Sequence, residues 1–373
     1  MTESRPGSRR ASRTPSRPSV TIRDVAKAAG VSTATVSRVL SGNRSVADEY
    51  ARAVLKATAE LGYRGDTVAR ALRRGATEVV GVVVPDIANP FFPRVVQAIE
   101  RSLHDTQHGL LLGDSGNDPE VEAQRISALL DRRVDGLVIV PCHAHHSVDA
   151  VAEAARHVPI VQLDRRVEGV ESDDVGVDDA AGITMTTEHL ISRGRRRLAF
   201  VGAERRISTA ERRAAAFLAT VERLLPSGVP PRMLEGDFSM DWGEAAGTTL
   251  LEERPAPDAI VCANDMIALG VLRALRLRGV AVPRDVAVTG FDDVGFAVVS
   301  DPPLTTARQP LAALGDACTR LLLERIRGDE SPARHITLAA ELVVRASTGG
   351  AGGPLSNPGS ASAKPTPEEE STT

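Results

Sequence analysis

The sequence is poor in aromatic residues and cysteine, and it has no long apolar run. Phe, Trp and Tyr together make up 3% of its 373 residues, so a core must be built from Val, Leu, Ile and Ala, which suits helices packed on parallel strands. The cysteines Cys142, Cys262 and Cys318 show no CxxC spacing, and we expect buried free thiols. No run approaches the ~20 residues of a membrane span, and the N-terminus lacks a signal-peptide pattern. We therefore expect a cytoplasmic protein.

The spacing patterns of catalytic sites are also missing. Ser, His and Asp are scattered without a nucleophile elbow, and neither GxGxxG nor P-loop spacing occurs. The stretch Cys142–His146 carries metal-capable atoms, but ligands so close in sequence seldom share one tetrahedral site. We expect no catalytic residue, no metal and no cofactor, and we expect this stretch to be a loop.

Charge is distributed unevenly along the chain. The first 74 residues hold 15 Lys and Arg against 6 Asp and Glu, a net charge of +9, although the whole chain carries −4. The remainder holds 30 basic and 43 acidic residues and therefore carries −13. A basic N-terminal module on an acidic body indicates that only the front of the chain meets a polyanion such as DNA.

Residues 20–41, VTIRDVAKAAGVSTATVSRVLS, have the pattern of two short helices joined by a glycine. Apolar residues recur at helical spacing from Ile22 to Ala29, Gly30 breaks the pattern, and Ser32 can cap the second helix. The outer face of that second helix is small and polar, with Thr33, Ala34, Ser37 and Arg38. A helix buried on all sides would not carry such a face, so the stretch predicts a DNA-binding helix-turn-helix.

The segments around this motif are less regular. A third helix is expected at Asp48–Leu61, with an inner stripe of Tyr50, Val54, Ala57 and Leu61 and a stop at Gly62. Residues 67–75 are helix-prone but short, and isolated helices below ~12–15 residues are marginal in water, so this segment should order only against a partner. Residues 1–19 and 349–373 have the composition of disordered tails.

From Val79 onward, short apolar runs alternate with helical patterns. The runs begin near Val79, Leu110, Gly136, Pro159, Val175, Arg197, Asp258 and Val286. This alternation is typical of α/β architecture, with parallel sheets covered by helices on both faces. Because the region is too long for one small sheet, we expect two similar lobes with a ligand cleft at the carboxyl ends of their strands.

Five blocks follow one another in order between residues 20 and 348: VTIRDVAKAAGVSTATVSRVLSG, LGYRGDTVARALRRG, VVGVVVPDIANPFFPRVVQAIE, CANDMIALGVLRALRLRGVAVPRDVAVTGFDD and PPLTTARQP. Together they resemble the LacI family of transcriptional regulators, which includes the lactose and purine repressors. The resemblance implies an all-α helix-turn-helix headpiece at 20–64, a hinge helix at 65–78 and a periplasmic-binding-protein-like core at 79–348, in a homodimer. It places one lobe at about 79–178 and 305–334, and the other at about 179–304 and 335–348.

The resemblance also implies the DNA contacts. It places base-reading residues at Thr33, Ala34, Ser37, Arg38 and Arg44, backbone contacts at Thr21, Ser32, Thr35 and Tyr63, and minor-groove contacts of the hinge at Val68, Ala69 and Leu72. Arginine is the commonest reader of guanine, and a leucine wedge in the minor groove bends DNA. Ser41 stands where the family usually has Asn, and Gly65-Asp66 where it usually has Pro-Asn, which leaves the contribution of the hinge open.

For the core, the resemblance implies an effector site at Phe91, Phe92, Asp164, Asp178, Thr209, Arg213, Phe238, Asn264 and Asp292. We expect one of the two adjacent phenylalanines to face the pocket, and Trp242 to share its rim with Phe238. An arginine fork and carboxylates at strand ends can hold hydroxyl groups or a carboxylate, although Arg213 and Asp292 could form only an interlobe salt bridge. The expected effector is a sugar or polyol, and Ile207, where some purine-binding members have Arg, weighs against a purine.

The sequence thus predicts a dimeric repressor, not an enzyme, whose affinity for double-stranded operator DNA is controlled by a small-molecule effector. A sugar-binding transport protein has a similar core, but it would need an export signal and would have no DNA reader. The sequence leaves open whether the effector releases DNA or tightens binding.

Overall fold

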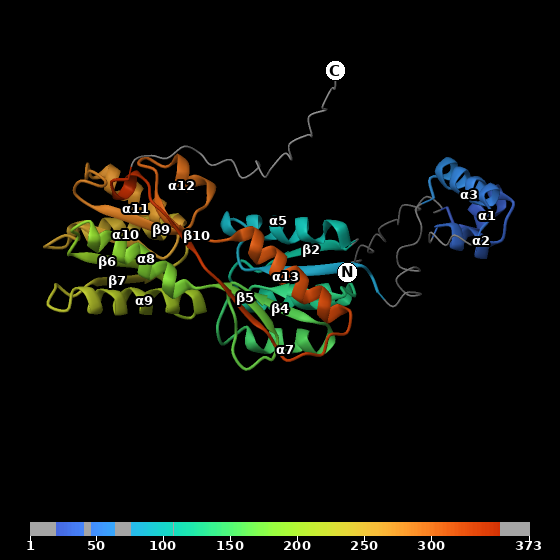
Figure 1. The fold of residues 1–373 in the computed structure, drawn as a ribbon, viewed down its shortest axis with the longest axis horizontal. Helices are drawn as coiled ribbons and strands as arrows, with labels where there is room; N and C mark the ends of the chain where they lie inside the picture. The colour runs from blue at the N-terminus through green and yellow to red at the C-terminus, as the bar shows by residue number, and fades with distance from the viewer. Residues whose placement is uncertain (1–19, 41–45, 64–75, 107, 351–373) are drawn as a thin grey trace, which may run out of the picture. The chain divides into compact units, whose positions relative to one another are not determined.

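The computed structural model describes residues 20–40, 46–63, 76–106 and 108–350. The chain divides into an N-terminal unit that ends at Thr77 and a larger unit that begins at Glu78 (Figure 1). The expected N-terminal tail, most of the expected hinge and most of the C-terminal tail lie outside the described residues. Within the described ranges, no helix combines the length and apolarity needed to cross a bilayer.

In the described residues of the N-terminal unit, 20–40, 46–63 and 76–77, three helices surround a small aliphatic core. Helix α1 spans Ile22–Ala29, α2 spans Thr33–Leu40 and α3 spans Asp48–Leu61, which confirms the predicted helix-turn-helix and third helix. The buried core consists of Val25, Ala26, Val36, Val54 and Ala57.

Local sequence explains where these helices begin and end. The hydroxyl and the N–H of Thr21 both donate to Asp24 Oδ2, at 2.7 and 2.8 Å, and Ser32 Oγ accepts from the N–H of Thr35 at 3.2 Å. Gly30 ends α1 with a φ of 68°, a left-handed conformation that glycine adopts without strain.

Two residues of α3 differ from the prediction. Tyr50 and Leu61 were expected to face inward, but they are 48% and 37% exposed. Helix α3 has 14 residues whereas α1 and α2 have 8 each, so both ends of α3 extend past the core that the shorter helices can cover.

The first lobe of the larger unit is a parallel sheet with strand order β11-β5-β4-β3-β1-β2. Its strands are β1 (Val79–Val84), β2 (Gly109–Asp114), β3 (Gly136–Ile139), β4 (Ile160–Leu163), β5 (Asp173–Val177) and β11 (His335–Leu338). Helices α5 (Phe91–Leu103) and α13 (Leu311–Ile326) pack together, and α6 (Pro119–Asp131) packs with α7 (Val148–His157) (Figure 1). A short helix, η1, covers His104–Thr106.

The second lobe repeats this plan with strand order β12-β10-β9-β8-β6-β7. Its strands are β6 (Leu198–Ala203), β7 (Arg232–Gly236), β8 (Ala259–Cys262), β9 (Ala287–Asp292), β10 (Thr305–Arg308) and the antiparallel edge strand β12 (Glu341–Val343). Helices α8 (Asp179–Ser192) and α9 (Ser208–Leu224) form one pair, and α10 (Met240–Glu252) and α11 (Asp265–Leu277) another. Two short helices, α12 (Gly295–Val299) and η2 (Ala346–Thr348), complete it.

The points at which the chain returns from one lobe to the other differ from the expected boundaries. Residues 305–308, expected in the first lobe, form β10, which pairs with β9 of the second lobe. Residues 335–338, expected in the second lobe, form β11, which pairs with β5 of the first lobe. Each strand lies at or next to the edge of its sheet. Each is only four residues long, TTAR and HITL, and so short a segment carries little information about its partner strand.

Candidate DNA-binding surface and ligand cleft

Helix α2 presents the small and polar face that the sequence predicts. Thr33, Ala34 and Arg38 are exposed, Ser37 is partly exposed, and Val36 on the opposite face is fully buried. Such a face fits against base edges in the major groove, and an arginine there can donate two hydrogen bonds to a guanine.

The residues expected to contact the DNA backbone lie mostly at the starts of α1 and α2. Thr21 precedes α1, and the hydroxyls of Ser32 and Thr35 lie 3.0 Å apart at the start of α2. Helix N-termini favour phosphate groups through their free N–H groups and dipole. Tyr63, just after α3, is half-buried against the helical core. The other expected DNA contacts lie outside the described residues: Arg44, Val68, Ala69 and Leu72.

A second candidate site is a small cavity between the two lobes, at the carboxyl ends of their strands. Its side chains leave a free volume of about 10 Å³, room for about one water molecule. The lining consists of Asn89, Phe91, Phe92, Asp164, Arg165, Thr209, Arg213, Phe238, Asn264, Asp292 and Gln309. Eight of the expected effector residues are thus brought together, and both phenylalanines of α5 line the cavity, so the expectation that only one would do so is wrong.

Arg213 of α9 is held from several sides. Its Nε donates to Asp179 Oδ1 at 2.7 Å and its Nη1 donates to the carbonyl of Ala263 at 2.8 Å. Its guanidinium carbon lies 3.8 Å from the ring centroid of Phe291. The expected partner of Arg213 was Asp292, but its Oδ1 lies 4.0 Å from Arg213 Nη1. Asp179 is therefore the principal ion-pair partner of Arg213. This network fixes the guanidinium beside the cavity before any ligand arrives.

Two carboxylates of the cavity belong to residues with a positive φ angle, and both are buried away from water. Asp164 and Asp292 have φ angles of 62° and 111°, a left-handed region that is uncommon for non-glycine residues. Burial raises the pKa of Asp292 to about 7, against the opposing effects of Arg213 and of the hydrogen bond that Gln309 Nε2 donates at 2.7 Å. Burial also raises the pKa of Asp164. Ligand hydroxyls could replace the water that both carboxylates have lost.

Two expected effector residues do not line the cavity. Asp178 is exposed and caps α8, where its Oδ1 accepts from the N–H of Ala181 at 2.9 Å. Trp242 packs on Gly236, where a Cβ would lie 2.4 Å from the indole, and its Nε1 donates to the carbonyl of Gly202 at 2.9 Å. The indole is therefore committed to the second lobe.

Several functional residues escaped the sequence analysis. Asp179 directly follows Asp178 and turns inward after the helix cap, where its Oδ1 accepts from Arg213 Nε beside the cavity. Arg165 directly follows Asp164 in the sequence LDRR, so only its position at a strand end could have indicated a role. Asn89 and Gln309 also line the cavity, and no sequence signal distinguishes them from ordinary loop residues.

The stretch Cys142–His146 forms a turn at the boundary between the lobes. His143 is buried, and its Nδ1 accepts from the N–H groups of His145 and His146 at 3.1 and 3.2 Å. The N–H of Ala144 donates to the carbonyl of Arg206 in the second lobe at 2.8 Å. The histidine nitrogen thus stabilises the turn, and no metal-binding cluster occurs within the ranges that the structure describes.

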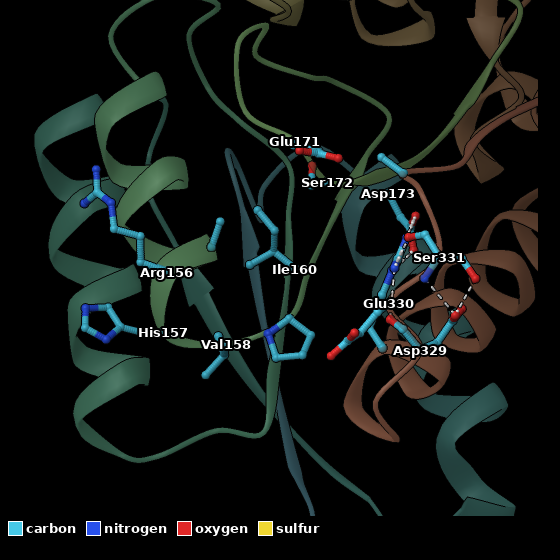
Figure 2. Close-up of a pocket in the computed structure, with 14 residues that line it drawn as sticks. Arg156, His157, Val158, Ile160, Glu171, Ser172, Asp173, Asp329, Glu330 and Ser331 are labelled. Atoms are coloured by element: carbon cyan, nitrogen blue, oxygen red, sulfur yellow. Dashed lines mark hydrogen bonds and ion pairs between the residues drawn. The ribbon is translucent and has the colours of Figure 1, made fainter.

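A larger cavity of about 490 Å³ lies at the opposite, amino end of β4 (Figure 2). Arg156 and His157 of α7 form one wall, and the other carries Asp173, with both oxygens bonded to Arg325 at 2.8 and 2.9 Å, beside Asp329 (Figure 2). Hydrogen bonds from Arg325 and Arg334 outweigh burial and lower the pKa of Asp173 to about 2. The Asp173 network therefore connects β5 to α13 and to the chain entering β11, and none of the expected effector residues lines this cavity.

Known proteins match both parts of the chain. A model described as "Bacterial regulatory proteins, lacI family" matches residues 21–66, and one described as "Periplasmic binding protein-like domain" matches residues 187–348. The transcriptional regulator reg1 of Streptomyces lividans is 36% identical over 90% of this chain and 98% of its own length. A lac repressor dimer bound to operator and the anti-inducer ONPF matches with a TM-score of 0.81 at 29% identity, over 88% of this chain and 99% of that one. A complex of the regulator CelR with cellobiose matches with a TM-score of 0.64 at 30% identity, over 89% and 100%.

Proposed function

This chain belongs to the LacI family of bacterial regulatory proteins, and we propose that it is a transcriptional repressor whose hold on operator DNA is set by a small molecule bound between its lobes. The observation that carries this function is the presence in one chain of two separate sites. Exposed Thr33, Ala34 and Arg38 on α2 suit DNA, whereas the buried Arg213 and Asp292 suit a small polar ligand.

We infer that the effector is a sugar. Carboxylates such as Asp164 and Asp292 accept hydrogen bonds from hydroxyl groups, and the rings of Phe92 and Phe238 can lie against the apolar faces of a sugar ring. The match to CelR, whose complex contains cellobiose, supports this class of ligand.

The repressor acts as a homodimer on a pseudo-palindromic operator, as the match to the lac repressor dimer supports. Apolar side chains are exposed in both lobes: Leu111 and Leu112 on the edge strand β2, and Phe296 and Val299 on α12, which are 54% and 73% exposed. A second copy of the chain would cover such surfaces. Each subunit then places one α2 in a major groove.

The remaining assignments belong to the same proposal. Thr33, Ala34, Ser37, Arg38 and Arg44 read bases, and Thr21, Ser32, Thr35 and Tyr63 contact the DNA backbone. Val68, Ala69 and Leu72 occupy the minor groove between the two headpieces.

We further infer that the chain catalyses no reaction and works in the cytoplasm, where operator DNA is. Asp179 is bound by two arginines and Asp292 by Gln309, so both carboxylates are held in place by partners within the protein.

Operator selection from a random DNA pool by the full-length protein tests this function. We expect enrichment of a two-fold symmetric sequence, and fluorescence anisotropy on that sequence should change when cellobiose, other disaccharides or pentoses are added. The direction of the change shows whether the sugar induces or corepresses. Enrichment of no sequence over random DNA would contradict the proposal.

A further inference from the structure

The turn between β3 and α7 is one of the places where the first lobe contacts the second, and His143 lies at its centre. The residue is 8% exposed, and its Nδ1 accepts from the N–H groups of His145 and His146 at 3.1 and 3.2 Å. The N–H of Ala144, in the same turn, donates to the carbonyl of Arg206 in the second lobe at 2.8 Å. One histidine nitrogen therefore holds the turn in the shape that offers this donor to the second lobe.

The two hydrogen bonds to Nδ1 determine the charge of His143. An imidazole nitrogen can accept a hydrogen bond only while it carries no proton, so these bonds require the neutral ring with its proton on Nε2. A proton on Nδ1 would convert the acceptor into a donor that faces two other N–H groups. The turn can therefore close only around a neutral His143.

The surroundings of His143 also disfavour a positive charge on its ring. His146 stacks on it with 4.0 Å between the ring centroids, and His145 lies 6.2 Å away. The second lobe contributes the cation of Arg206 and, in the opposite sense, the carboxylate of Glu204. Burial, followed by His146 and Arg206, lowers the pKa of His143.

The other elements of the first lobe contact the turn beside the ring. Glu122 of α6 is fully buried, and its Oε2 accepts from the N–H of Cys142 at 2.7 Å. Arg165, after β4, acts electrostatically on the same Cys142. Ser147, the cap of α7, accepts from the main-chain N–H of His143 at 3.1 Å. These oxygens accept from main-chain groups and not from the imidazole.

We propose that the turn at residues 142–147 is a pH-sensitive contact between the lobes, which is closed while His143 is neutral and opens when the ring takes up a proton. Opening withdraws the N–H of Ala144 from Arg206, so acidification weakens the contact between the lobes. The inference does not depend on the proposed function, because the turn responds to protons whatever the cleft and the headpiece bind.

The size of the response follows from proton linkage. The closed turn binds a proton less tightly than the open turn, so the open form gains as pH falls below the ordinary pKa of histidine, 6.5. If the closed turn excludes the proton from Nδ1, the ratio of open to closed turns rises by up to about 30-fold between about pH 7.5 and about pH 5.

Hydrogen exchange of the full-length protein, resolved to single amides, tests this response. In His143→Asn the side-chain oxygen can replace Nδ1 as acceptor but does not titrate. The amides of His145 and His146 are compared in parent and variant at each pH, which removes the intrinsic pH dependence of exchange. The ratio of parent to variant exchange rates should rise by up to about 30-fold from about pH 7.5 to about pH 5. His157→Asn, at an exposed histidine of α7, is the matched control and should exchange like the parent in the turn.

A second variant shows whether the imidazole closes the turn at all. His143→Leu removes the acceptor at every pH, so the same two amides should already exchange faster than in the parent at about pH 7.5, while the thermal melting of the protein reports that it is folded. A parent-to-Asn ratio that stays constant with pH would overturn the proposal, as would a folded His143→Leu protein with parent-like exchange in the turn. The amide of Ala144 must follow the same pH dependence, because exchange there that ignores pH would show that the turn does not control the bond to Arg206.

Discussion

Replacing Asp292 with Asn should stabilise the ligand-free protein at neutral and alkaline pH while removing its response to effector. The carboxylate is 4% exposed, so ionisation takes place without water around it. An asparagine has the same shape, and its oxygen can still accept the hydrogen bond that Gln309 Nε2 donates at 2.7 Å. The change therefore removes a buried charge and retains its main hydrogen bond.

The size and sign of the effect follow from the raised pKa of Asp292. Burial moves this pKa from 3.8 to about 7, a shift of about three units, which corresponds to at most about 4 kcal/mol. The folded state binds the proton more tightly than the unfolded state, so the contribution of Asp292 to stability is greatest below about pH 4 and declines until pH passes about 7. Asparagine does not ionise, so the variant escapes this decline.

Thermal unfolding of the full chain at about pH 5 and about pH 8 measures the difference. The Asp292→Asn variant should unfold several degrees higher than the parent at the higher pH, because 1 kcal/mol corresponds to roughly 2–4 °C in a domain of this size. The difference between the two proteins should be smaller at about pH 5 and should vanish below about pH 4, where the carboxyl is protonated in both the folded and the unfolded state. Asp131→Asn, which changes an exposed carboxylate at the end of α6, is the control and should shift neither curve. An Asp292→Asn variant that melts below the parent at pH 8 would show that the ionised carboxylate stabilises the fold.

Three further outcomes are expected. Arg38→Ala should weaken binding to the selected operator by about 1–3 kcal/mol and relax preference at one base pair per half-site, and an unchanged ratio of specific to random binding in fluorescence anisotropy would contradict that role. Leu72→Ala should weaken operator binding and DNA bending in gel-shift assays with permuted sites, because minor-groove wedges support the bend, while the melting of the core stays unchanged. Asp173→Asn should destabilise the protein at pH 7, and the loss in unfolding free energy should shrink as pH falls toward about 2. A carboxyl with a lowered pKa contributes stability above its unfolded pKa, and this contribution disappears as the carboxyl is protonated. A loss in unfolding free energy that is the same at every pH in chemical denaturation would contradict this.

The elements of the fold were predictable wherever the sequence carried its own local signal. Glycine stops, a serine cap and runs of valine specified the three headpiece helices and the central strands, and the two-lobed architecture followed from their alternation. The lobe that each strand at or next to a sheet edge would join was harder to predict. β10 and β11 exchanged lobes relative to the prediction, because a strand of four residues does not reveal which sheet it will join.

For the site, the sequence predicted which residues lie near the cleft better than it predicted which of them contact one another. Strand ends and the family resemblance located most of the cleft residues, among them Asp164 and Asp292. Contacts that depend on one residue of register could not be read: Asp179, and not Asp178, meets Arg213, and Trp242 turns away from the cavity toward Gly202.

If a ligand in the cleft and a DNA site at α2 are coupled through the chain, each must change the affinity of the protein for the other by the same factor. A sugar that raises the melting temperature of the full-length protein is titrated by calorimetry, first with free protein and then with protein saturated by its selected operator. We expect the operator to change the Kd of the sugar by about 5–150-fold and the sugar to change the Kd of the operator by the same factor. Equal sugar affinities with and without operator would contradict this coupling.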